Sequence, residues 1–257
     1  MISRQAVVFI PVRTRRMNAR FSLGEEVDRF AGAELQDGDI LVISSKFIAI
    51  SEGRIIDLER VMPGGDAVTL SRRLNMPPEL CELVIRECDE VVGGVSGFML
   101  TLKEGLLTPN AGIDKSNIEH GRVVLYPRNP FESASSLVEE MRFRRGVGIG
   151  VVVSDSRLMP TRKGTVGVAL AAAGVEAIVD LRGKPDLFGN VLRVTSQAIA
   201  DDLCSGAQVL MGEANETVPV VLVRGLGTNS GRQYPMSSFA VDPGQCVYMR
   251  SLGYRAK

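Results

Sequence analysis

The 257-residue chain contains a single histidine, no tryptophan and only four cysteines. A Ser-His-Asp or Cys-His catalytic unit would have to use His120, and a histidine-rich zinc site is excluded. His120 stands next to Gly121 in a sequence typical of a turn, so we predict a surface residue, with a catalytic role as the alternative. The cysteines form no Cys-x-x-Cys pair, so neither a zinc ribbon nor a thioredoxin-like site is indicated.

Net charge and long apolar segments are also absent. Thirty basic residues balance thirty acidic ones, so no overall field favours nucleic acid or an anionic membrane. No apolar run approaches the ~20 residues that span a bilayer, and the first ten residues lack the features of a signal peptide. We therefore expect a cytoplasmic protein that binds neither nucleic acid nor a membrane.

The expected secondary structure mixes strands and helices. Runs rich in Val and Ile predict strands at 6–12, 39–44, 98–102, 122–126, 147–153, 177–181 and 218–223. Apolar residues at helical spacing predict helices at 78–88, 132–145 and 196–211. Because their order is not a regular βαβ repeat, we expect an α+β fold.

The domain organisation has two interpretations. Residues 1–257 form a single domain, or two lobes at 1–127 and 131–231 meet at the proline-containing segment 127–130. The tail at 232–257 has weak periodicity, and it either caps the body or docks onto a partner.

Two apolar runs end in short acidic segments. Asp114 lies in the string Asn110-Ala-Gly-Ile-Asp-Lys-Ser-Asn117, and Asp155 lies in the string Ser154-Asp-Ser-Arg157, which we expect to be a loop after the strand 147–153. Carboxylates flanked by hydroxyls and amides suit a hard divalent cation. Taken singly, each aspartate is better explained as a cap or an Asx turn. Taken together, and with Glu213, they favour a metal site for phosphoryl chemistry.

Common nucleotide-binding loops are missing. No Walker A string occurs, and the glycines at 146–150 precede a strand instead of following one. The string at 225–231, Gly-Leu-Gly-Thr-Asn-Ser-Gly, follows a predicted strand and would offer backbone N–H groups to a phosphate, although a surface turn is the favoured alternative. Arg157, Arg162 and Lys163 follow Asp155, and beside an acidic metal site they indicate an anionic substrate.

The string around Asp114 resembles the Asn-Ala-Gly-Ile-Asp-x-Ser-Asn motif of the coenzyme F420-0:L-glutamate ligases, the gamma-glutamyl ligase family. Further matching strings follow in order between residues 6 and 227, at 37–42, 52–54, 152–155, 160, 162–167, 186–189, 210–213 and 219–225. The resemblance implies an uncommon mixed α+β fold with two lobes, and an intertwined homodimer. It also implies an enzyme that joins L-glutamate to the lactyl carboxylate of the deazaflavin cofactor F420-0.

The chemistry implied by the resemblance uses GTP as co-substrate and two divalent ions, Mn²⁺ or Mg²⁺. An acyl phosphate would form and then be attacked by the glutamate amine, so no side-chain nucleophile is required. Asp114 and Asp155 would bind one metal ion, and Ser156 and Glu213 the second. The nucleotide would be bound by Ser45, Lys46, Asn117, Met211, Gly212, Glu213, Ala214 and Asn215. We assign Arg157 and Arg162 to the anionic substrate.

The chain departs from the family pattern in its nucleotide-binding residues. Ile50 stands where the family carries a nucleotide-binding lysine, and Arg13-Thr-Arg-Arg-Met17 replaces a Gly-Leu-Pro turn. Arg13, Arg15 or Lys46 would then have to supply the missing positive charge. Two alternatives follow, namely a paralogue with a different carboxylate substrate or altered nucleotide use, and a non-catalytic ligand-binding homologue.

Overall fold

The computed structural model describes residues 6–229 and 231–255, which form two compact units. Unit 1 contains the N-terminal segment up to Arg15 together with Ser22–Ser44 and Phe131–Tyr234. Unit 2 contains Arg16–Phe21, Ser45–Pro130 and the C-terminal segment from Pro235. Helices and strands occur in both units, in agreement with the α+β class. The units interleave along the chain, and the lobes 1–127 and 131–231 stay a prediction.

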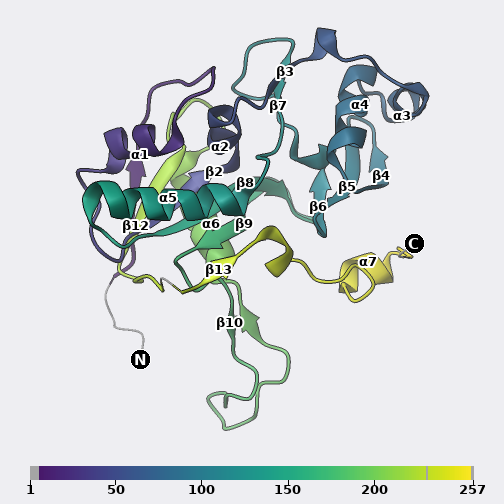
Figure 1. Ribbon diagram of the computed structural model, residues 1–257. Coiled ribbons are helices and arrows are strands. Elements are labelled where there is room, and N and C mark those ends of the chain that lie inside the picture. Colours follow the sequence, from purple (N-terminus) through teal and green to yellow (C-terminus); the bar gives the residue numbers. More distant parts are fainter. Residues whose placement is uncertain (1–5, 230, 256–257) are drawn as a thin grey trace. The chain divides into compact units, whose positions relative to one another are not determined.

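Unit 1 is built on a six-stranded sheet with the order β1-β12-β2-β8-β9-β13 (Figure 1). Its strands are β1 (Val8–Val12), β2 (Ile40–Ser44), β8 (Gly150–Leu158), β9 (Thr165–Ala173), β12 (Val220–Arg224) and β13 (Gln233–Tyr234). Only β2 and β8 are parallel, and their register places Ser44 opposite Ser154. The central strands are apolar and buried on both faces, which requires a covering layer on each side of the sheet.

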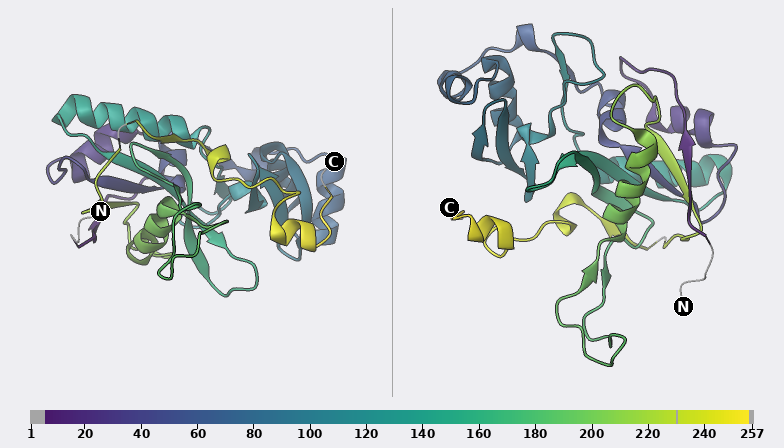
Figure 2. Two further views of the ribbon diagram at one scale, coloured as in Figure 1. Left: turned by 90° about the horizontal axis from the view of Figure 1, so that it is seen from below. Right: turned by 180° about the vertical axis from the view of Figure 1, so that it is seen from behind.

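Helices provide those layers. Unit 1 contains α1 (Leu23–Ala31), α5 (Pro130–Arg145) and α6 (Ile199–Met211). Figure 2 shows α5 and α6 on opposite faces of the sheet, and an ion pair between Arg145 and Asp28 joins α5 to α1. The approach of α6 to β9 is close, because a Cβ atom at Gly167 would lie 2.3 Å from the carbonyl oxygen of Cys204. Gly167 is thus required by packing.

A hairpin arm projects from unit 1 (Figures 1 and 2). It contains the short antiparallel strands β10 (Val179–Asp180) and β11 (Ser196–Gln197). At its tip, Asp186 Oδ1 accepts hydrogen bonds from the backbone N–H groups of Phe188 and Asn190, both at 2.8 Å. This turn leaves Leu187 and Phe188 exposed. The predicted strand 177–181 is therefore reduced to the two residues of β10.

Unit 2 combines a helical pair with a small antiparallel sheet. Helices α3 (Gly65–Leu74) and α4 (Pro78–Glu87) enclose a core with the sheet of β4 (Glu90–Val95), β5 (Phe98–Lys103) and β6 (Leu106–Pro109). A second sheet pairs β3 (Ile55–Asp57) with β7 (Arg122–Val124). The other elements of this unit are α2 (Ser45–Ser51), the 3-10 turns η1 (Leu58–Arg60), η2 (Asn110–Gly112) and η3 (Met236–Ser238), and α7 (Val247–Ser251).

The C-terminal tail packs within unit 2. Met236 and Met249 are buried, and the hydroxyl of Tyr254 donates to Glu90 Oε2 at 2.7 Å. These contacts support the capping interpretation. None of the helices in the described residues has both the length and the apolar character needed to cross a membrane.

The structure confirms the three predicted helices within a few residues, as α4, α5 and α6. It also places His120 in an exposed turn, as predicted. One prediction was wrong, because Ser154–Arg157 is not a loop. Strand β8 continues to Leu158, since a register shift after Val153 lets the chain keep its pairing with β9.

Candidate functional site

Asp114 is positioned by a turn of three consecutive left-handed residues. Asn110, Ala111 and Gly112 have φ angles of 49°, 52° and 75°. The Asn110 side chain stabilises the turn by accepting a hydrogen bond of 2.8 Å from the buried backbone of β5, and a Cβ atom at Gly112 would lie 2.1 Å from the Tyr126 ring. Left-handed backbone at non-glycine residues is held only where its surroundings enforce it. The first three residues of the motif therefore shape the backbone that presents Asp114.

The carboxylate of Asp114 belongs to a set of oxygens around one ammonium group. Lys46 Nζ lies 2.6 Å from Asp114 Oδ2, and it donates to Ser116 Oγ at 2.8 Å and to the Ser116 carbonyl at 3.1 Å. Burial raises the pKa of Asp114, but the charge of Lys46 and the hydrogen bonds from Lys46 and Ser116 outweigh it and lower the pKa overall. Asp114 is thus ionised at neutral pH and already arranged around a cation.

Two other predicted nucleotide-binding residues, Ser45 and Asn117, lie near this set in the sequence. Ser45 is buried at the first position of α2, directly after the end of β2. Asn117 adopts a left-handed φ of 53° in the turn after Ser116. Their role in nucleotide binding stays a prediction.

Ile50 is a packing residue. Its side chain is 5% exposed and forms an apolar cluster with Ala49 and Val124, against which Met17 and Phe21 pack. Met17 belongs to the segment 13–17, which replaces the family's Gly-Leu-Pro turn. The two departures from the family pattern, Ile50 and this segment, therefore lie in one cluster. Apolar packing occupies the position of the family's lysine.

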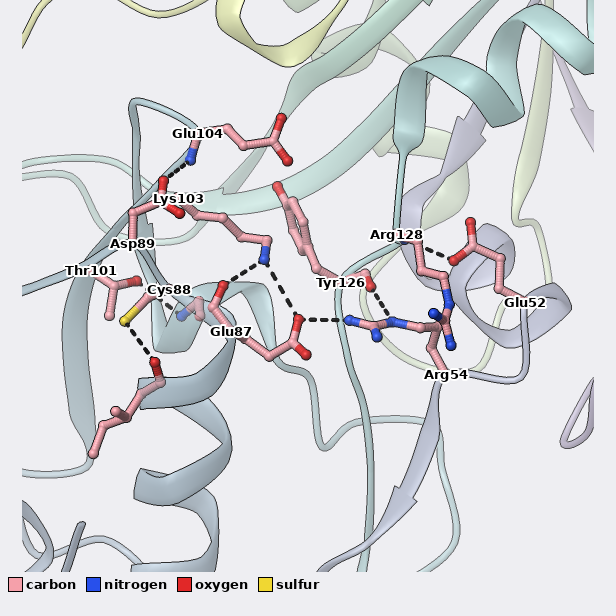
Figure 3. A network of polar contacts seen from close by, with 12 residues as sticks. Glu52, Arg54, Glu87, Cys88, Asp89, Thr101, Lys103, Glu104, Tyr126 and Arg128 are labelled. Carbon is pink, nitrogen blue, oxygen red and sulfur yellow. Dashed lines mark hydrogen bonds and ion pairs between the residues drawn. The ribbon is translucent and has the colours of Figure 1, made fainter. Parts of the chain in front are cut away.

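Several matching strings are structural. In Figure 3, Arg54 reaches Glu87 Oε2 at 2.6 Å, while Lys103 lies 3.5 Å from the same oxygen. Glu52 accepts a hydrogen bond from the backbone N–H of Arg128 at 2.8 Å. The Arg54, Glu87 and Lys103 side chains are largely buried, and a buried charge needs its partners. The string Glu52-Gly-Arg54 thus joins β3, α4 and β5.

The matching string at 37–42 also has a structural role. Asp39 is 1% exposed and pairs with Arg224 through contacts of 2.7 and 2.8 Å. Asp37 accepts the backbone N–H of Gly148 at 2.8 Å. These aspartates fix the start of β2 and do not form an open acidic site.

In unit 1, two hydroxyl groups and an amide contact the carboxylate of Glu213. Ser156 Oγ donates to Glu213 Oε2 at 3.2 Å, while Thr165 Oγ1 and Gln208 Nε2 both donate to Oε1. Because successive residues of a strand point to opposite faces, Asp155 leaves β8 on the other side from Ser156. The structure brings Ser156 and Glu213 into contact and adds Thr165 and Gln208, which the sequence did not single out. The role of Ser156 and Glu213 in metal binding stays a prediction.

Asp155 contacts one of the two predicted substrate-binding arginines, Arg157. Its Oδ2 accepts a hydrogen bond of 3.0 Å from Arg157 Nε, and the Arg157 residue is 7% exposed. Arg157 also favours the charged form of Asp201, whose pKa is nonetheless raised because burial dominates. Arg162 is exposed on the turn between β8 and β9. The roles of both arginines in substrate binding stay a prediction.

Of the predicted nucleotide-binding stretch 211–215, Met211 is the buried last residue of α6, and the following residues form a loop that is exposed at Glu213–Asn215. Gly212 has a φ of 67°, and Ala214 N donates to Glu216 Oε2 at 2.9 Å. Thr14 N donates to the carbonyl of Thr217 at 3.0 Å, so the segment after β1 runs beside this loop.

The three residues expected to supply the missing positive charge, Arg13, Arg15 and Lys46, differ in their contacts. Arg15 pairs with Glu26, a buried carboxylate, at 2.8 Å, and Lys46 pairs with Asp114. Arg13 Nη1 reaches only the carbonyl of Glu216, at 3.5 Å. In the described part of the chain no ion pair involves Arg13, so its charge is available to a ligand at the loop.

The residues present fit a hard divalent cation. Carboxylate, hydroxyl and carbonyl oxygens surround Lys46, and two hydroxyls lie against the carboxylate of Glu213. Asp114 belongs to unit 2, whereas Asp155, Ser156 and Glu213 belong to unit 1. Within residues 6–229 and 231–255, no three His, Cys, Asp or Glu side chains form a metal-binding cluster by themselves.

Comparison with known proteins shows the family of the chain. Residues 12–225 match the F420-0:Gamma-glutamyl ligase family. The coenzyme F420:L-glutamate ligase of Methanocaldococcus jannaschii is 39% identical over 220 residues, which are 82% of this chain and 88% of that protein. The enzyme of the same name from Methanopyrus kandleri is 38% identical over 195 residues, which are 76% of this chain and 77% of that protein. The chain therefore belongs to the F420-0:gamma-glutamyl ligase family and is an enzyme of the ligase class.

Proposed function

We propose that this enzyme joins L-glutamate to the lactyl carboxylate of F420-0, using GTP and two divalent metal ions. The observation that carries the proposal is the match, along most of the chain, to the F420-0:gamma-glutamyl ligase family and to proteins named coenzyme F420:L-glutamate ligase. The oxygen-rich surroundings of Asp114 and Glu213 support it, because such ligands suit the metal ions of phosphoryl transfer.

The reaction consists of two transfers. A carboxylate oxygen of the substrate attacks the γ-phosphorus of GTP, which gives an acyl phosphate and GDP. The amine of glutamate then attacks the acyl carbon, so an amide forms, phosphate leaves and one proton is released to solvent. Neither transfer requires a nucleophile from the protein, in agreement with a chain that has one exposed histidine.

The protein's contribution is to position charge. Asp114 and Asp155 bind one ion, and Ser156 and Glu213 bind the other, with Glu213 oriented by Thr165. When bound, the two ions neutralise the charge that builds up on the phosphoryl oxygens.

Substrate contacts come from arginines and backbone groups. The loop Met211–Asn215 and Lys46 contact the nucleotide, and Arg13 supplies a phosphate contact in place of the lysine that Ile50 replaces. Arg157 and Arg162 contact the anionic substrate. The active protein is a homodimer, which light scattering after size-exclusion chromatography tests.

The test supplies GTP, Mn²⁺, L-glutamate and F420-0 to the purified protein. Mass spectrometry is expected to find a product heavier by one glutamate, with one GDP released for each product. Asp114→Asn and Asp155→Asn are expected to abolish it, whereas Asp66→Asn, the same change at an exposed aspartate of α3, is not. A folded wild-type protein that binds Mn²⁺ but forms no product would refute the proposal.

A second candidate is an enzyme of the same family with a different carboxylate substrate or altered nucleotide use. The apolar cluster around Ile50 favours it, because a positive charge of the family's pocket is replaced by packing. This candidate predicts that Mn²⁺ raises the unfolding temperature but that GTP does not raise it further. Stabilisation by GTP would exclude altered nucleotide use.

A further inference from the structure

The ammonium group of Lys46 occupies a site that has the ligands of a metal site. Its three hydrogen-bonding partners are a carboxylate oxygen of Asp114, the hydroxyl of Ser116 and the carbonyl of Ser116, at 2.6 to 3.1 Å. Hard divalent ions take the same three kinds of oxygen at shorter distances. One position in unit 2 can therefore hold either the ammonium or a metal ion.

The oxygens are held more firmly than the ammonium. Asp114 exchanges two backbone hydrogen bonds of 2.9 Å with Val124, and its Oδ1 accepts the backbone N–H of Ser116 at 2.7 Å. Lys46 reaches the set on a four-carbon stem with several rotatable bonds, and its side chain is 22% exposed. The lysine can swing away while the oxygens stay in place.

We propose that Lys46 is a built-in counter-ion that holds the Asp114 oxygens in the metal-free enzyme and is displaced when the ion binds. A divalent ion and an ammonium group compete for Asp114 Oδ2, because like charges repel at such distances. Once displaced, the ammonium is free to contact a phosphate of the nucleotide. Metal binding therefore prepares nucleotide binding through a single side chain. This inference rests on the proposed function, because it takes Asp114 as a metal ligand.

The experiment measures Mn²⁺ binding without nucleotide, from the electron paramagnetic resonance signal of free Mn²⁺. Lys46→Met is expected to bind Mn²⁺ about fivefold more tightly than the wild type, the factor expected from the loss of a partly exposed competing ion pair. Lys115→Met is the matched control, because it removes the same charge from an exposed neighbour of Asp114. Asp114→Asn identifies which part of the binding belongs to this site.

Two results would overturn the two parts of the proposal. Mn²⁺ binding by Lys46→Met that is no tighter than in the Lys115→Met control would overturn the displacement of Lys46 by the ion.

With Mn²⁺ saturating, Lys46→Met is expected to bind GTP about tenfold more weakly, since a charge-assisted phosphate contact is lost. Unchanged GTP binding would overturn the transfer of the ammonium to phosphate. Lys46→Gln serves as a second variant if the methionine variant unfolds. A wild-type protein that binds no Mn²⁺ even with GTP would instead refute the proposed function.

Discussion

Replacing Ile50 by lysine restores the residue of the family pattern and tests whether this position has become part of the core. The Ile50 side chain is 5% exposed, and the apolar side chains of Met17 and Phe21 pack against its cluster. A lysine there would lose its hydration among apolar side chains. We therefore expect Ile50→Lys to destabilise the protein without creating a nucleotide contact.

The magnitude follows from two contributions. Removing the buried isoleucine side chain costs about 2 kcal/mol. Keeping a lysine neutral at pH 7, with its pKa lowered by about three units below 10.4, costs about 4 kcal/mol at most. Snorkelling of the stem towards water reduces the second contribution. We expect a loss of about 3–5 kcal/mol, a large part of the about 5–15 kcal/mol that stabilises a typical domain.

Urea unfolding followed by circular dichroism measures this loss. Ile50→Met is the control, because a swap of similar volume is expected to cost about 1 kcal/mol. Met17→Gly combined with Ile50→Lys is expected to recover part of the stability by opening a path to solvent. If Ile50→Lys were as stable as Ile50→Met and bound GTP more tightly than the wild type, the cluster would be a nucleotide pocket and our reasoning would be wrong.

Three further predictions concern packing, metal binding and pH. Gly167→Ala is expected to cost about 1–3 kcal/mol in urea unfolding, because the new Cβ meets the backbone of α6, whereas Gly65→Ala, which meets nothing within 4 Å, is expected to be neutral; equal effects would contradict the close approach. Glu213→Gln is expected to lower the number of Mn²⁺ ions bound from two to one and to reduce activity at least about 100-fold, since the transition-state charge loses one counter-ion; unchanged Mn²⁺ stoichiometry would remove Glu213 from the site. Because the pKa of Asp114 is lowered in the folded protein, the stability it contributes is present above its ordinary value of 3.8 and is lost as the pH falls through the lower folded value. The difference in urea midpoint between wild type and Asp114→Asn is therefore expected to shrink below about pH 4, and a difference that stays constant to pH 2 would contradict the shift.

The sequence predicted single elements better than their pairing. Strand β8 and helix α5 are recognisable from local pattern, but β9 was not predicted. Its sequence, Thr165–Ala173, contains four alanines and one glycine, residue types that are depleted in strands. These small residues are needed because α6 lies so close to β9, a long-range contact that no local window contains.

In the candidate site, too, residues in short local strings were predicted, whereas contacts between distant segments were not. Asp114, Ser156 and Glu213 were named from short strings, and the structure places Ser156 against Glu213. Thr165 and Gln208, which also contact Glu213, come from β9 and α6, so only the folded chain reveals them. The short helix α2 was missed because a brief apolar run has no period that separates helix from strand.

The position of β12 in the sheet has a consequence for biosynthesis. Strand β12 pairs with β1 on one side and with β2 on the other, although nearly the whole chain separates it from β1. While the ribosome is still making the protein, the edge strand β1 has no partner in the sheet, and its backbone groups must wait for residues near Val220–Arg224. Such distant pairing slows folding and exposes strand edges to aggregation. We expect nascent chains that stop before β12 to depend on chaperones, and full-length chains to be released from them.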